Sequence, residues 1–95
     1  MSQVLKVYSV CDSKTKIFHP PHYSRTEPDA LRSFQQLIND ERSTLNQFTD
    51  DFDLYYLGEY YDDTGKFDLL DTPQHIVKAI QLKQHKKPEL APQAE

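Results

Sequence analysis

The chain has 95 residues, a net charge of −4 and an apolar share of 37%, below the roughly 45–50% of an average globular protein. One small domain with a thin core is expected, and six tyrosines and five phenylalanines must supply much of its apolar surface. No run reaches the ~20 apolar residues of a membrane span. The single cysteine, Cys11, excludes an intrachain disulfide and a cysteine-based zinc site. With only Gly58 and Gly65, a Walker loop and a dinucleotide-binding fingerprint are excluded as well.

The first third of the chain predicts a β-hairpin. Residues 3–10 are β-branched and aromatic enough for a strand, and residues 12–15 are a polar turn. Residues 16–18 begin a return strand, which Pro20 and Pro21 end because proline has no N–H to donate.

A helix is predicted next. Thr26 is a favourable N-cap, Asp29 follows three residues later, and Pro28 fits the first turn. Apolar residues then recur at the spacing of one helical face up to residues 39–40, at Ala30, Leu31, Phe34, Leu37 and Ile38. Residues 41–51 are polar and aperiodic, which indicates a surface loop.

The second half repeats this order. A strand is predicted over 53–61, a hairpin turn over 62–65 closed by Gly65, and a return strand over 66–70. Thr72 and Pro73 are expected to open a second helix, with Ile76, Val77, Ile80 and Leu82 on its buried side. The domain is expected to span residues 1–84. Residues 85–95 have no apolar period, which predicts a disordered tail.

The predicted fold is α+β, with two layers: about four antiparallel strands and two helices on one face, in the order ββα-ββα. The turns near Asp12 and Asp62 are alike, and each hairpin is followed by proline. Two explanations of this likeness stay open: internal duplication of a ββα unit, and chance similarity.

Charge is unevenly distributed. Residues 1–35 carry +2, residues 36–71 carry −8 and residues 72–95 carry +2. A nonspecific DNA-binding protein usually has a basic excess, so the sum argues against that class. The polarity could guide DNA or a second copy of the same chain.

Two runs of spaced motifs carry a family resemblance: Tyr8-Ser9-Val10, Asp12, Lys14, Phe18 and Pro20 with Ala30, Arg32, Phe34 and Asn39-Asp40, then Asp51-Phe52, Leu54-Tyr55, Leu57-Gly58, Tyr60, Asp62, Thr64-Gly65, Phe67 and Pro73. Over residues 4–80 the chain resembles the small non-structural proteins of gokushoviruses, single-stranded DNA phages of the Microviridae. The resemblance implies a DNA-binding protein of single-stranded genome synthesis or packaging. It also implies a location in the host bacterial cytoplasm and absence from the mature virion. It brings no catalytic residue or cofactor, so we expect no enzyme.

Basic and aromatic residues of the first third are the candidate contacts to single-stranded DNA, because bases stack on exposed rings while lysines neutralise phosphates. The expected sheet face carries Lys6, Tyr8, Lys16, Tyr56 and Tyr60. The full set is Lys6, Tyr8, Lys14, Lys16, Tyr23, Arg25 and Arg32, with Lys83, Lys86 and Lys87 adding charge near the C-terminus.

The alternative is an assembly adaptor without DNA affinity. Tyrosine is enriched in protein interfaces, and one strand has four: Tyr55, Tyr56, Tyr60 and Tyr61. They would serve a homodimer or a contact with phage replication or capsid proteins.

Other chemistry has simpler explanations. His19 and His22 lack the spacing of a rolling-circle nickase and a further metal ligand, so we expect exposed loop histidines and no metal. Cys11 has no neighbouring base and is expected to be a packing residue. A solvated acidic face is favoured over a cation site for Asp50, Asp51, Asp53, Asp62, Asp63, Asp68 and Asp71.

Overall fold

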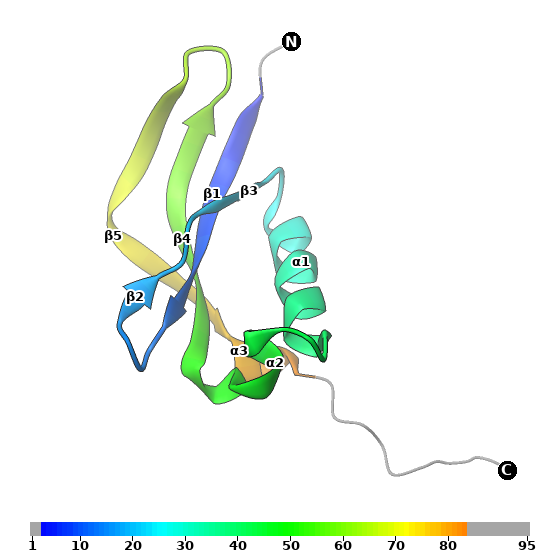
Figure 1. Ribbon diagram of the computed structural model, residues 1–95. Coiled ribbons are helices and arrows are strands. Elements are labelled where there is room, and N and C mark those ends of the chain that lie inside the picture. Colours follow the sequence, from blue (N-terminus) through cyan, green and yellow to red (C-terminus); the bar gives the residue numbers. More distant parts are fainter. Residues whose placement is uncertain (1–2, 84–95) are drawn as a thin grey trace, which may run out of the picture.

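The protein is an antiparallel sheet with its helices gathered on one side, so the predicted α+β class is confirmed (Figure 1). The computed structural model describes residues 3–83. The elements in chain order are β1 (Val4–Asp12), β2 (Ile17–Phe18), β3 (His22–Ser24), α1 (Glu27–Asn39), α2 (Thr44–Gln47), the 3-10 turn η1 (Thr49–Asp51), β4 (Phe52–Tyr61), β5 (Lys66–Lys78) and α3 (Ala79–Leu82). None of these helices is long and apolar enough to cross a membrane.

The long strands β1 and β4 form the centre of the sheet. The strand order is β2-β1-β4-β5, and β3 also pairs with β1. Because residues 6–8 of β1 pair with β3 and β4 at once, β3 lies on the same edge of β1 as β2. The short strands β2 and β3 form one edge of the sheet, and the chain continues from β3 into α1 (Figure 1). β5 forms the opposite edge.

A bulge in β4 changes which residues share a face. Tyr8 pairs with Tyr56 and Val7 with Gly58, so Leu57 has no partner on β1. Side chains alternate between faces along a strand, and an extra residue reverses that alternation. Tyr56 therefore lies on one face, and Tyr60, which pairs with Leu5, lies on the other.

The core lies between the sheet and α1. Tyr8, Val10 and Leu54 of the sheet pack against one helical face, together with Ala79 of α3. The predicted period of α1 is confirmed for Ala30, Phe34 and Ile38, which are the buried residues of that helix. Leu37, predicted on the same face, is instead 47% exposed. The predicted cap is also present: Thr26 Oγ1 accepts a hydrogen bond from the Asp29 N–H at 3.3 Å.

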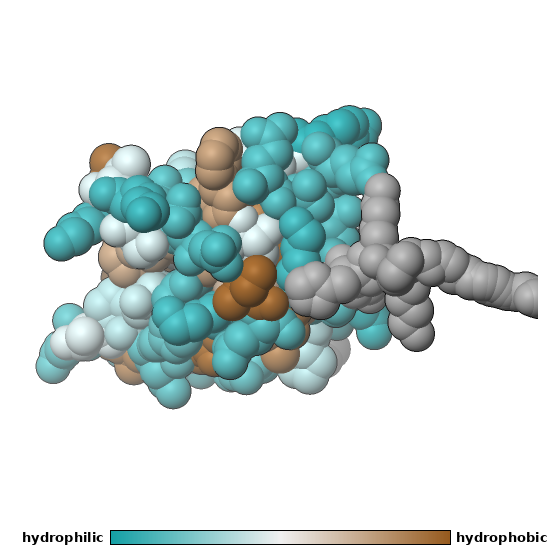
Figure 2. All heavy atoms as spheres, turned by 90° about the horizontal axis from the view of Figure 1, so that it is seen from below, coloured by the Kyte–Doolittle hydropathy of each residue, from teal (hydrophilic) through white to brown (hydrophobic). Residues whose placement is uncertain are grey.

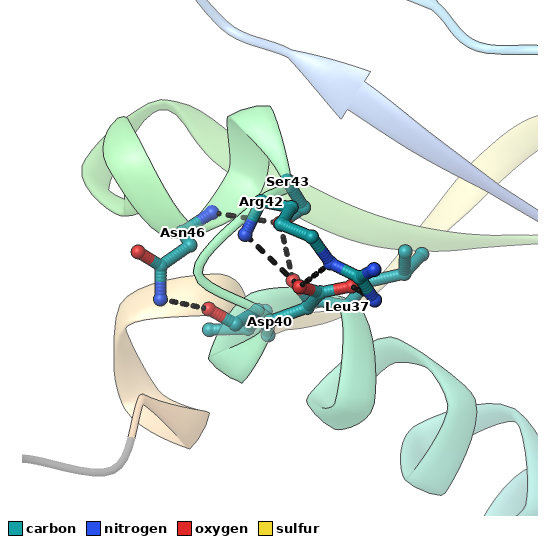
Figure 3. A network of polar contacts seen from close by, with 6 residues as sticks. Leu37, Asp40, Arg42, Ser43 and Asn46 are labelled. Carbon is teal, nitrogen blue, oxygen red and sulfur yellow. Dashed lines mark hydrogen bonds and ion pairs between the residues drawn. The ribbon is translucent and has the colours of Figure 1, made fainter.

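Residues 41–51 are not the aperiodic surface loop that we predicted. They contain α2 and η1, and Leu45 and Thr49 are buried. Polar side chains build this segment (Figure 3): Ser43 Oγ donates to the Leu37 carbonyl, and Asn46 Nδ2 donates to the Ile38 carbonyl at 2.9 Å. These bonds satisfy carbonyls that the end of α1 leaves free.

The predicted helix over 72–82 is wrong, because β5 continues to Lys78 and only residues 79–82 are helical. The β-branched residues Ile76 and Val77 suit a strand that pairs with β4. Gly58 pairs with Leu69 and Tyr56 pairs with Gln74, so the four residues 70–73 form a bulge opposite the single residue Leu57. Pro73 is tolerated in this bulge because its position has no regular ladder pairing. The predicted tail, residues 85–95, lies outside the described residues.

Candidate nucleic-acid interface

The sheet face opposite the helices carries most of the partly exposed aromatic rings. We call it the open face. Register places on it Leu5 of β1, Phe18 of β2, Tyr23 of β3, Tyr55 and Tyr60 of β4, and Phe67, Leu69 and His75 of β5. The core cluster contains none of these residues.

The first aromatic cluster joins three strands. The Tyr60 ring centroid lies 5.5 Å from that of Tyr23 and 5.0 Å from that of Phe67. Tyr23 is 44% exposed and Phe67 is 49% exposed, so both rings contact solvent. Together with Leu5 and Gly65 they line a shallow hollow.

The second aromatic cluster lies nearer to α3 along β4. The Tyr55 ring contacts two rings edge-on: its centroid lies 5.1 Å from that of Phe18 and 5.3 Å from that of His75. His75 Nε2 also lies 3.0 Å from Asp53 Oδ2, and Lys78 Nζ lies 3.6 Å from the same oxygen. The single carboxylate in this contact set is therefore paired with basic groups.

Exposed basic side chains flank these clusters. Lys14 and Lys16 lie in the turn between β1 and β2, where the Lys14 N–H donates to Asp12 Oδ1 at 2.9 Å and Lys16 has a positive φ of 62°. This turn leads directly into Phe18. Arg25 follows Tyr23 by two residues and is also exposed.

Tyr8 is not a surface ring, contrary to prediction. Its side chain is fully buried, and burial raises the pKa of the phenol to about 12, with Glu27 and then Tyr56 adding to the rise. Lys6 lies on the same, helix-side face, where its Nζ stands 5.5 Å from the Tyr56 ring centroid. The expected platform of Lys6, Tyr8, Tyr56 and Tyr60 is therefore divided between two faces by the β4 bulge.

The four tyrosines of β4 are divided in the same way. Tyr55 and Tyr60 lie on the open face, whereas Tyr56 packs on the core and Tyr61 donates to Glu59 Oε1 at 3.0 Å. Arg32 is exposed on α1, on the side of the sheet away from these clusters. Sequence reasoning missed Phe18 and Phe67 as site residues; the signal was Gly58, since glycine within a strand often marks a bulge.

Of the two histidines predicted to lie in an exposed loop, His19 is exposed, whereas His22 is half-buried in β3. The His22 ring stacks on the Tyr8 ring with a centroid distance of 6.2 Å, and the His19 ring contacts the Phe52 ring edge-on with a centroid distance of 5.7 Å. Residues 3–83 contain no group of three or more side chains that could hold a metal ion. Burial raises the pKa of the Cys11 thiol, and two nearby carboxylates raise it further, which disfavours the nucleophilic thiolate.

The end of the molecule formed by α2 and α3 is a different surface. Figure 2 shows it as largely hydrophilic, with separate hydrophobic groups. Phe48 and Ile80 are partly exposed there. Lys83, expected to add charge toward DNA, instead donates from Nζ to the Asn46 carbonyl at 2.8 Å and to Thr49 Oγ1 at 3.1 Å. Lys86 and Lys87 lie outside the described residues.

Comparison with known proteins identifies the family. A family model described as Phage ORF5 protein matches residues 5–82. The chain belongs to this phage protein family. The Phage ORF5 match covers the sheet from Leu5 onward, including both aromatic clusters of the open face. No curated protein and no solved structure matches the chain.

Proposed function

We propose that this phage accessory protein binds single-stranded DNA on the open face and acts in viral genome synthesis or packaging. The observation that carries the proposal is the pair of partly exposed aromatic clusters on a sheet face that no described helix covers. The resemblance to gokushovirus non-structural proteins supports the same role. So does membership of a phage family. The role needs no catalysis or cofactor, and it places the protein in the host cytoplasm rather than in the mature virion.

Stacking gives the preference for single strands. A base that stacks on an aromatic side chain contributes roughly 1–3 kcal/mol, whatever its sequence. Bases of a duplex are stacked on each other and are not available to stack on the rings of the open face. Phe18, Tyr23 and Phe67 are 42–49% exposed, so each can offer part of its ring to an unpaired base.

Electrostatic attraction to the phosphates is expected to contribute less to the binding free energy than stacking does. The chain carries a net charge of −4, and three of the predicted basic contacts, Lys14, Lys16 and Arg25, are exposed. Neutralising about three phosphates would give a salt slope of about −2 for a single strand. We therefore expect shallow salt dependence and a binding energy that comes mainly from the rings.

The test is fluorescence anisotropy of a labelled single-stranded oligonucleotide with Phe18→Ala and Tyr23→Ala, one variant from each cluster. Loss of one stacking ring is expected to weaken binding by about 5- to 150-fold. Phe48→Ala is the matched control, because Phe48 is 54% exposed but belongs to the α2 end. Circular dichroism verifies that each variant is folded.

Equal affinities for all three variants would refute the open face as the DNA site. Failure of the unaltered protein to bind any oligonucleotide at low salt would refute the function. The assembly adaptor would then be the better explanation, with the same aromatic rings contacting another protein.

A further inference from the structure

The outer edge of β5 is unpaired and apolar. β5 pairs with β4 on one side, and no strand within residues 3–83 pairs with its other side. Three of the four residues 67–70 are large, apolar and well exposed: Phe67 at 49%, Leu69 at 55% and Leu70 at 42%. Exposed apolar edges are sites where another strand can pair, and folded proteins usually protect them.

The regular part of this edge is short. Residues 66–69 pair one-to-one with residues 58–61 of β4, whereas residues 70–73 form the bulge that ends with Pro73. Proline has no N–H, and a bulge interrupts the ladder. Only the segment from Lys66 to Leu69 is therefore fit to receive an added strand.

We propose that this segment and the adjoining Gly65 pair with the same residues of a second copy, antiparallel and centred on Phe67. Such a two-fold arrangement places Lys66 opposite Asp68 of the second copy, and does so twice. It also places Leu69 opposite Gly65 of the second copy, where a missing side chain leaves room: a Cβ on Gly65 would meet nothing within 4 Å.

Charge selects this register over its neighbours. Centring the pair on Asp68 would oppose two aspartates, and like charges directly opposite each other are destabilising. Centring it on Leu69 would place Phe67 opposite Asp71 of the second copy, and centring it on Leu70 would place Phe67 opposite Pro73. Only the Phe67-centred register pairs opposite charges and apolar rings together.

The dimer extends the open face. Phe67 lies on the open face and Asp68 on the helix-side face, and a two-fold axis perpendicular to the sheet keeps each face on its own side. Two Tyr23–Tyr60–Phe67 clusters then lie next to each other across the axis. This dimer does not depend on DNA binding, so its formation is tested without DNA.

Sedimentation equilibrium from about 10 μM to about 1 mM protein tests the dimer, since so short a pairing gives a weak complex. The average mass is expected to rise above the monomer mass of 11.2 kDa toward twice that value. Lys66→Glu and Asp68→Lys each oppose like charges at two positions and should weaken association about tenfold or more.

The double variant Lys66→Glu/Asp68→Lys restores both pairs and should return to within about threefold of the original association constant. Lys14→Glu, a charge reversal in the β1–β2 turn, is the control and should change nothing. A monomer at every concentration would overturn the proposal. So would a dimer that survives both single reversals, or one that the double variant fails to restore.

Discussion

At the scale of single residues, Gly58 decides how the sheet is built. Its φ of +145° is unfavourable for other residues, and an added Cβ would lie 2.4 Å from the Asp68 carbonyl oxygen and 2.7 Å from Leu69 Cα. This glycine therefore permits both the bulge and the close approach of β5. Without the bulge, Tyr56 and Tyr60 would share a face and the open-face cluster would lose its central ring.

Gly58→Ala is expected to destabilise the fold by about 2–4 kcal/mol, because backbone atoms must move and the positive φ becomes strained. Gly65→Ala is the comparison, since Gly65 has a φ of +72° but open space around it. Conformational strain alone should cost about 1–2 kcal/mol there. Urea unfolding measures both, and equal losses would contradict the close approach at Gly58.

His22 makes stability depend on pH. Burial lowers the pKa of its imidazole below the ordinary value of 6.5. As the pH falls through about 6.5, the unfolded chain binds a proton that the folded chain does not, so stability decreases. Between pH of about 7.5 and about 5.5, the unaltered protein should lose more stability in urea than His22→Gln does. Parallel pH profiles would show that His22 does not carry the effect.

At the scale of elements, local signals located α1 but not the course of β5. The cap at Thr26 and the period of Ala30, Phe34 and Ile38 are local properties, and both are present. Thr72-Pro73 also resembles a helix start, but the pairing of Gln74 and Val77 with β4 prevails. Strand pairing between distant residues overrides a weak local preference, and this information is not contained in residues 72–82 alone.

Thr26→Ala should cost about 1 kcal/mol, because the Asp29 N–H loses its partner at the start of α1. Thr26→Ser keeps a hydroxyl acceptor and should recover most of the loss. Urea unfolding midpoints of the two variants make the comparison. Equal midpoints for the alanine and serine variants would show that the hydroxyl does not cap this helix.

At the scale of the whole molecule, the sheet separates two chemistries. The helix-side face builds the core from Tyr8, Val10 and Leu54, and the open face gathers rings from four strands. Sequence alone indicated that aromatic and basic residues mattered, and it identified Tyr23, Tyr55 and Tyr60. It did not reveal which face each ring occupies, because one extra residue in β4 reverses the alternation.

Binding of single-stranded DNA by the open face is tested by anisotropy of labelled single-stranded and double-stranded oligonucleotides over a series of salt concentrations. Binding through the open-face rings predicts a clear preference for the single strand and a shallow salt slope of about −2. Equal affinity for both forms, with a steep loss of binding in salt, would mean that phosphate attraction alone holds the DNA. That result, or no binding at low salt, would contradict the claim.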